Sequence, residues 1–240
     1  FIGGLVSGSL ALLSDAVHNL GDAGAILLSF FAHLWSRKNK DTKKTFGYQR
    51  AEVLAAFTNA VALILISAFL VVEAIERFQK PTQITGNLML IVSIIGLLGN
   101  FVSMLVMHAD SQHNMNVKST FLHMMSDAIS SVGVIIAAVV IKFTQINWID
   151  PVMTIIVALL VLREAVKIVR DSINILMESN PNLDLQDVKE TILACGPVKN
   201  VHHMHVWKLA DDQIMLDAHI NVDNDFSVRE LENIYDKISR

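Results

Sequence analysis

The sequence predicts an α-helical membrane protein that continues into a cytoplasmic α/β domain. Hydrophobic residues make up 52% of the 240 residues, and they are concentrated before residue 170. A strongly basic segment follows the first complete apolar run and orients the membrane part of the chain. Beyond residue 176 the composition becomes that of a soluble module. We therefore predict a transmembrane domain over residues 1–175 and a C-terminal domain over residues 176–240.

Four apolar runs are long enough to cross a bilayer, which requires about 20 mostly apolar residues per helix. They cover residues 10–35, 53–78, 87–108 and 120–142. A fifth run, 149–170, begins apolar and ends with four charged residues whose long side chains can reach the membrane surface: Arg163, Glu164, Lys167 and Arg170. Residues 1–8 are interpreted as the end of a preceding span, which gives a six-span bundle with a truncated first span.

The segments between the runs determine the orientation. The segment after the first run holds a single acidic residue, Asp41, and six basic ones: Arg37, Lys38, Lys40, Lys43, Lys44 and Arg50. The positive-inside rule places this segment in the cytoplasm. Alternation then places residues 77–86 and 142–148 outside, and everything after residue 171 inside. Short loops without long His-rich insertions favour a bacterial or archaeal inner membrane.

The C-terminal domain reads as helix, strand, strand, helix. Residues 182–196 have helical spacing of apolar residues and end at a glycine followed by proline. Two β-rich segments, 198–209 and 212–222, predict a hairpin. Residues 227–239 are again helical, with Ser227 and Glu230 forming a capping box. Because this last pattern runs to the end of the sequence, the domain is interpreted as truncated.

Composition and motifs exclude several classes of function. A net charge of −4 gives no reason to expect nucleic-acid binding. The single cysteine, Cys195, excludes an internal disulfide framework and any CxxC metal site. No GxxxxGK[ST] loop is present, so ATP is not the expected energy source.

Two pairs of ionisable residues lie inside the predicted spans. His18 and Asp22 are four residues apart, and so are His123 and Asp127. In an α-helix this spacing puts both side chains of a pair on one face. Ionisable residues are costly in a bilayer and usually face a bundle interior or a water-filled cavity. Two imidazoles and two carboxylates form a ligand set suited to tetrahedral Zn²⁺, with Co²⁺ or Cd²⁺ as competitors.

This ligand set predicts exchange of metal for protons. Metal binds ionised carboxylate and neutral imidazole, so its entry expels protons, and a midplane site opened to each side in turn would couple the two fluxes. One histidine alone could be a hydrogen-bonded packing residue, but the repeated pair argues for a shared site. Two alternatives remain, a zinc-dependent membrane enzyme and a membrane zinc sensor. The chain is predicted not to be an enzyme, because it has no HExxH helix.

The sequence resembles the cation diffusion facilitator family of zinc transporters. The similar stretches are "SLALLSDAVHNLGD", "FGYQRAEVLAAF", "NVKSTFLHMMSDAISSVGV", "DP" at 150–151, "LMESNP" and "VHHMHVWKL". The resemblance implies a six-span homodimer with cytoplasmic ferredoxin-like domains, and zinc export driven by proton influx. It also implies that His18, Asp22, His123 and Asp127 form the transport site.

The resemblance suggests a further zinc site in the C-terminal domain. His202, His205 and His219 match or lie near the positions at which members of the family bind zinc. His203 could substitute, although strand alternation would group it with His205. Hydrogen-bonded strand histidines are the alternative interpretation.

Two other features of the family bear on the cytoplasmic loop. Arg50 and Glu178 match a salt bridge that joins the membrane helices to the C-terminal domain. Some bacterial members bind a second metal in this loop through one Asp and two His. Here Asp41 remains, but Lys44 and Tyr48 occupy the histidine positions, so this site is predicted to be absent.

Overall fold

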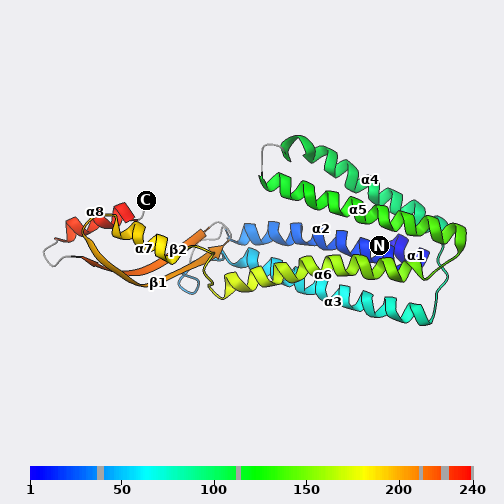
Figure 1. Cartoon of the computed structure of the whole chain (residues 1–240), viewed down its shortest axis with the longest axis horizontal. Helices are drawn as coiled ribbons and strands as arrows, with labels where there is room; N and C mark the ends of the chain where they lie inside the picture. Colours follow the sequence, from blue (N-terminus) through cyan, green and yellow to red (C-terminus); the bar gives the residue numbers. More distant parts are fainter. Residues whose placement is uncertain (37–40, 112–114, 211–212, 223–226, 239–240) are drawn as a thin grey trace. The chain divides into compact units, whose positions relative to one another are not determined.

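The computed structural model describes residues 1–36, 41–111, 115–210, 213–222 and 227–238. In these residues the elements follow the order shown in Figure 1: α1 (Ile2–Ser7), α2 (Leu10–Ser36), α3 (Ala51–Gln79), α4 (Gly86–Ser111), α5 (Met115–Thr144), α6 (Ile149–Leu176), α7 (Leu185–Leu193), β1 (Val198–Ala210), β2 (Gln213–Val222) and α8 (Val228–Ile238). The five long helices coincide with the five predicted apolar runs.

The long helices have the length that a bilayer requires. They contain 26 to 30 residues, which at 1.5 Å per residue gives roughly 40 Å. By length and composition, three helical segments among the described residues qualify as membrane spans: Ala51–Gln79, Gly86–Val106 and Met124–Thr144. The predicted first and fifth runs are not among them. Helix α2 interrupts its apolar sequence with Asp15, His18 and Asp22, and the second half of α6 is charged.

The chain divides by its internal contacts into two compact units. One comprises Phe1–Ser29 and Ala56–Val169, and the other comprises Phe30–Ala55 and Arg170–Arg240. The second unit therefore includes the last turns of α2 and α6 and the first turn of α3 together with the C-terminal elements. This division by contacts differs from a boundary after residue 175, which remains a prediction.

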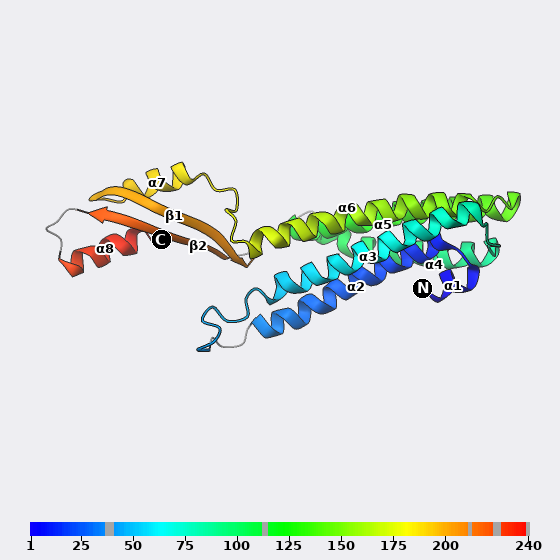
Figure 2. The same cartoon turned by 90° about the horizontal axis from the view of Figure 1, so that it is seen from below.

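Helix α2 takes part in three apolar cores of the first unit, one of which joins Leu10 to Leu70 and Ala74 of α3. In a second core, Ala11 and Leu12 pack with residues of α4 and α5: Met89, Val134, Ala137, Ala138 and Ile141. In the third, Val17 packs against the α3–α6 pair. A Cβ on Gly21 would lie only 2.5 Å from Leu63 Cδ2, so glycine there lets α2 approach α3 closely. Figure 2 shows α2, α3 and α6 running alongside one another.

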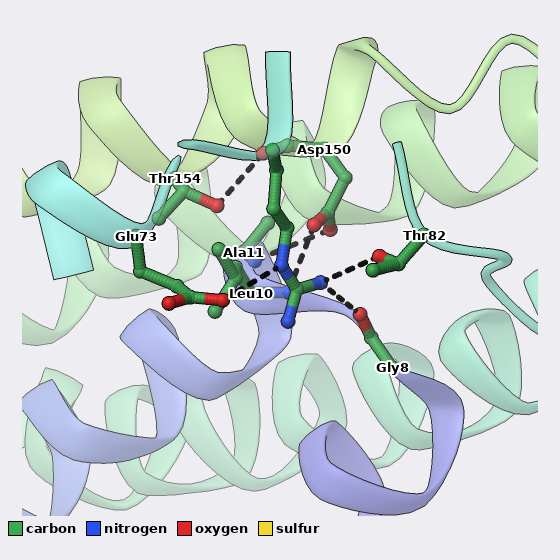
Figure 3. Close-up of polar contacts among 8 residues, drawn as sticks. Gly8, Leu10, Ala11, Glu73, Thr82, Asp150 and Thr154 are labelled. Atoms are coloured by element: carbon green, nitrogen blue, oxygen red, sulfur yellow. Dashed lines mark hydrogen bonds and ion pairs between the residues drawn. The ribbon is translucent and has the colours of Figure 1, made fainter. Parts of the chain in front are cut away.

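A buried polar network lies at the beginning of α2 (Figure 3). The side chain of Asp150, which is 0% exposed, accepts hydrogen bonds from the backbone N–H groups of Leu10 (2.8 Å) and Ala11 (3.2 Å). Arg77 of α3 donates to the carbonyl of Gly8 in the turn between α1 and α2. The start of α2 is thereby tied to α6, and the turn before it to α3.

The C-terminal elements form the predicted helix, hairpin and helix. β1 and β2 pair antiparallel, and α7 and α8 share one apolar core with the hairpin. Half of the predicted capping box is present: the backbone N–H of Ser227 donates to Glu230 Oε2 at 2.8 Å, while the backbone N–H of Glu230 donates to the Ser227 carbonyl. Hydrogen bonds from the Ser227 hydroxyl and backbone N–H hold the pKa of Glu230 below its usual value.

Candidate metal centre in the membrane helices

Helices α2 and α5 bring buried ionisable side chains together. His18 of α2 is 9% exposed and Asp127 of α5 is 7% exposed. His18 Nε2 lies 3.1 Å from Asp127 Oδ1 and 3.7 Å from Asp22 Oδ2. Ligand atoms of these three residues all lie within 4.8 Å of one another. The structure therefore places three members of the predicted quartet in one group.

His123 is the fourth member of the predicted quartet. The backbone of α5 places it four residues before Asp127, on the same helix face. Its side chain lies outside the part of the structure that is described. Its role as a ligand therefore stays a prediction.

The group has the spacing of a metal site that is nearly assembled. Atoms bound to one tetrahedral zinc ion at about 2.0–2.1 Å lie roughly 3.3 Å apart. The two distances from His18 Nε2, 3.1 and 3.7 Å, lie on either side of this separation. One imidazole and two carboxylates can therefore converge on a single ion with small side-chain movements.

Two neighbouring amide side chains donate hydrogen bonds to backbone carbonyls of α2. The side-chain amide of Asn19 donates to the carbonyl of Asp15 at 2.8 Å, within the same helix. The amide of Asn59 on α3 donates to the carbonyl of Gly21 at 3.2 Å. Asp15 is itself buried, one turn before His18. The Asn59 contact joins α2 to α3 beside the residues that meet α5.

A second group of ligand atoms lies on the C-terminal hairpin. His202, His203 and His219 bring one ligand atom each within 4.8 Å of the others. His202 is the cross-strand partner of His219, whereas His205 pairs with Asp217. The structure thus groups His203, and not the expected His205, with the other two histidines.

A β-bulge explains this difference. The register shifts between His202 and His205, and His203 has a φ of 51°, in the left-handed region. An extra residue in one strand disrupts the regular alternation of side chains. The alternation rule that grouped His203 with His205 therefore fails here, and the sequence carries no clear signal of the bulge.

The loop between α2 and α3 takes part in the predicted salt bridge with a residue that follows α6. Arg50 Nη2 lies 2.8 Å from Glu178 Oε1, which confirms this pairing. At the positions of the family's second metal site, the ammonium group of Lys44 lies 4.1 Å from the ring centroid of Tyr48. Asp41 Oδ1 accepts hydrogen bonds from the backbone N–H groups of Lys43 and Lys44, both at 2.7 Å.

Comparison with known families covers nearly the whole chain. The model of the cation efflux transmembrane domain matches residues 1–177, and that of the cation efflux protein cytoplasmic domain matches residues 180–240. The chain belongs to the cation efflux family. Membership confirms the resemblance seen in the sequence and the fold class, a helical transmembrane domain with a cytoplasmic C-terminal domain. Cation efflux proteins are transporters and not enzymes, as predicted.

Bacterial cation efflux proteins are similar over most of the chain. The cadmium, cobalt and zinc/H(+)-K(+) antiporter of Bacillus subtilis (strain 168) is 42% identical over 240 residues, 99% of this chain and 77% of the relative. Zinc transporter ZitB of Escherichia coli (strain K12) is 42% identical over 224 residues, 92% of this chain and 71% of the relative. The metal cation efflux system protein CzcD of Cupriavidus metallidurans is 36% identical over 220 residues, which are 91% of this chain and 70% of the relative.

Proposed function

We propose that this cation efflux protein exports Zn²⁺ from the cytoplasm in exchange for protons, as a homodimer in a bacterial inner membrane. The observation that carries the proposal is the convergence of buried His18 and Asp127 with half-buried Asp22 from two helices. Imidazole and carboxylate donors suit zinc, and cobalt or cadmium as competitors. The names of the relatives, which include zinc, cadmium and cobalt transporters, support this range of ions. His123 is proposed as the fourth ligand.

The coupling to protons follows from the chemistry of the donors. Zinc replaces the proton on an imidazole nitrogen and requires ionised carboxylates. When the site faces the cytoplasm, zinc binding therefore releases protons from it. When it faces outward, rebinding of protons weakens the ligands and releases zinc. His18 and Asp127, which contact each other at 3.1 Å, exchange their shared hydrogen bond for bonds to the ion.

A pH gradient is expected to drive zinc accumulation in reconstituted vesicles. The vesicles contain the full chain, their potential is held at zero, and zinc is followed with an internal fluorescent indicator. A difference of one pH unit supplies about 1.36 kcal/mol per proton, a factor of ten. The steady-state zinc ratio should therefore change about tenfold for each proton exchanged per ion. A ratio independent of the pH difference would contradict proton coupling.

We propose that His202, His203 and His219 form a second zinc site, in the cytoplasmic domain. Their ligand atoms lie within 4.8 Å of one another, and the buried Nδ1 of His202 has no hydrogen-bond partner among the described residues. A zinc ion would supply that partner. This group also supports the second candidate function, a zinc-sensing role of the cytoplasmic domain beside transport.

Substitution of His203 by Ala is expected to weaken zinc binding to the cytoplasmic domain by about a hundredfold. Loss of a residue that only orients a metal ligand lowers metal affinity 10- to 100-fold, and loss of a direct ligand should lower it at least as much. Binding is measured by calorimetry on the full chain carrying Asp127→Asn, which removes a ligand of the membrane site. His205→Ala serves as the control, since this side chain is outside the group. A loss in His205→Ala alone would favour the set proposed from the sequence, His202, His205 and His219. No loss in either would favour hydrogen-bonded strand histidines.

A further inference from the structure

A cavity of about 310 Å³ lies in the second unit, in the segment that joins α2 to α3. Loop residues form most of its wall, and Glu178, Trp207 and Leu209 complete it. Its volume is at the lower end of the range of ligand sites, which begins near 300 Å³. It is separate from both histidine-containing groups, because none of those residues lines it.

The cavity wall is positively charged. Lys43, Lys44 and Arg50 line it, and among the described residues of its wall Glu178 is the only one with a carboxylate. Because Arg50 and Glu178 form an ion pair at 2.8 Å, the two lysines are left as net positive charge. The nearby carboxylate of Asp41 is not part of the wall and accepts backbone N–H groups. The electrostatics therefore favour an anion.

Two buried polar atoms of the wall have no hydrogen-bond partner. They are Nε of Arg50, a donor, and Oε1 of Gln49, an acceptor, within the described part of the chain. Leaving buried polar groups unsatisfied is costly, and such groups in native proteins usually have a partner. A ligand that carries both an anionic oxygen and a hydroxyl group would satisfy the two atoms together. Phosphate esters of polyols have this composition.

The position of the cavity in the chain indicates where such a ligand would come from. Its loop residues, 43–50, lie between the end of α2 at Ser36 and the start of α3 at Ala51. Both helices belong to the transmembrane domain, and the loop is on the cytoplasmic side by its charge. Trp207 of the wall is a residue type enriched at the level of lipid headgroups. Basic pockets at this level suit anionic lipids of the cytoplasmic leaflet.

We infer that the cavity formed by residues 43–47, Gln49, Arg50, Glu178 and Trp207 binds the phosphate headgroup of an anionic glycerophospholipid, with phosphatidylglycerol as the representative. The two lysines and Arg50 face the phosphate, and Gln49 accepts a hydrogen bond from a headgroup hydroxyl. The same phosphate chemistry occurs in soluble phosphate esters, so the experiment must separate the two sources. The inference is independent of the proposed transport site.

The test measures lipid binding to the delipidated full chain in a neutral detergent by native mass spectrometry. Phosphatidylglycerol is titrated against wild type and against Lys43→Gln/Lys44→Gln, and we expect at least tenfold weaker binding to the variant. The matched control is Arg170→Gln/Lys199→Gln, which removes the same charge from exposed positions of the same unit outside the cavity and is expected to bind as wild type. Phosphatidylcholine should not bind saturably.

Two results would overturn the inference. Equal weakening in the two double variants would show non-specific attraction between charges. The second result is that phosphatidylglycerol does not bind, while glycerol 3-phosphate or inorganic phosphate saturates the site and binds more weakly to Lys43→Gln/Lys44→Gln. That result would assign the cavity to a soluble ester. Lys44→Gln removes the contact of the Lys44 ammonium group with the Tyr48 ring, so circular dichroism of each variant checks that folding is retained.

Discussion

Substitution of Asp127 by Asn should reduce zinc flux by about a hundredfold or more, to the level of empty vesicles. The change keeps the size of the side chain and removes the negative charge that faces His18 at 3.1 Å. An amide is a poor zinc ligand, and loss even of a residue that only orients a ligand lowers affinity 10- to 100-fold. Zinc flux into proteoliposomes under an imposed pH gradient measures the effect.

A matched control separates loss of the ligand from general damage to α5. Ile129 lies two residues further along the helix, and its side chain is 66% exposed. The Ile129→Ala variant should therefore retain wild-type flux. Gel filtration and circular dichroism should be unchanged in both variants. His123→Ala is expected to behave as Asp127→Asn, which tests the fourth ligand. Wild-type flux in Asp127→Asn would exclude this carboxylate from the site.

Much of this site was predictable because helical spacing is a local property. A separation of four residues puts His18 above Asp22 on one helix face whatever surrounds the helix. Their convergence with α5 then follows from the cost of exposing charges to lipid, which leaves the bundle interior as the favourable location. The repeated pair predicted a site shared by the two helices, whereas the 3.1 Å contact between His18 and Asp127 is information from the structure.

Other features depend on contacts that local patterns do not encode. The bulge that brings His203 to His219 depends on pairing of two strands, and alternation within one strand predicts the wrong neighbour. The pairing of Arg50 with Glu178 was accessible only through resemblance to a family, because 128 residues separate them. Asp150 was likewise visible only as part of the "DP" dipeptide, and its partners lie about 140 residues away.

Asp150 acts as the cap of α2 from another helix. The first N–H groups of a helix have no partner within it, and inside a membrane protein water cannot supply one. The hydroxyl oxygen of Ser9 accepts a hydrogen bond from Leu12 N–H at 3.1 Å. The Asp150 carboxylate accepts hydrogen bonds from the Ser9 hydroxyl and from the backbone N–H groups of Leu10 and Ala11. Asp150 thus satisfies the start of the helix that carries His18, and joins it to α6.

Asp150→Ala should therefore destabilise the protein by about 3–5 kcal/mol, because three buried donors lose their acceptor and each unsatisfied donor costs about 1–3 kcal/mol. Asp150→Asn keeps one carbonyl oxygen as an acceptor, so the free energy of unfolding should fall by less, about 1–3 kcal/mol. The measurement is unfolding in detergent micelles by increasing dodecyl sulfate, followed by circular dichroism. Thr154→Val is the control, because Thr154 is also 0% exposed on α6 but donates only to the carbonyl of Asp150 in its own helix. If Thr154→Val lost as much stability as Asp150→Ala, packing around α6 would explain the effect, and the carboxylate would not be the cap.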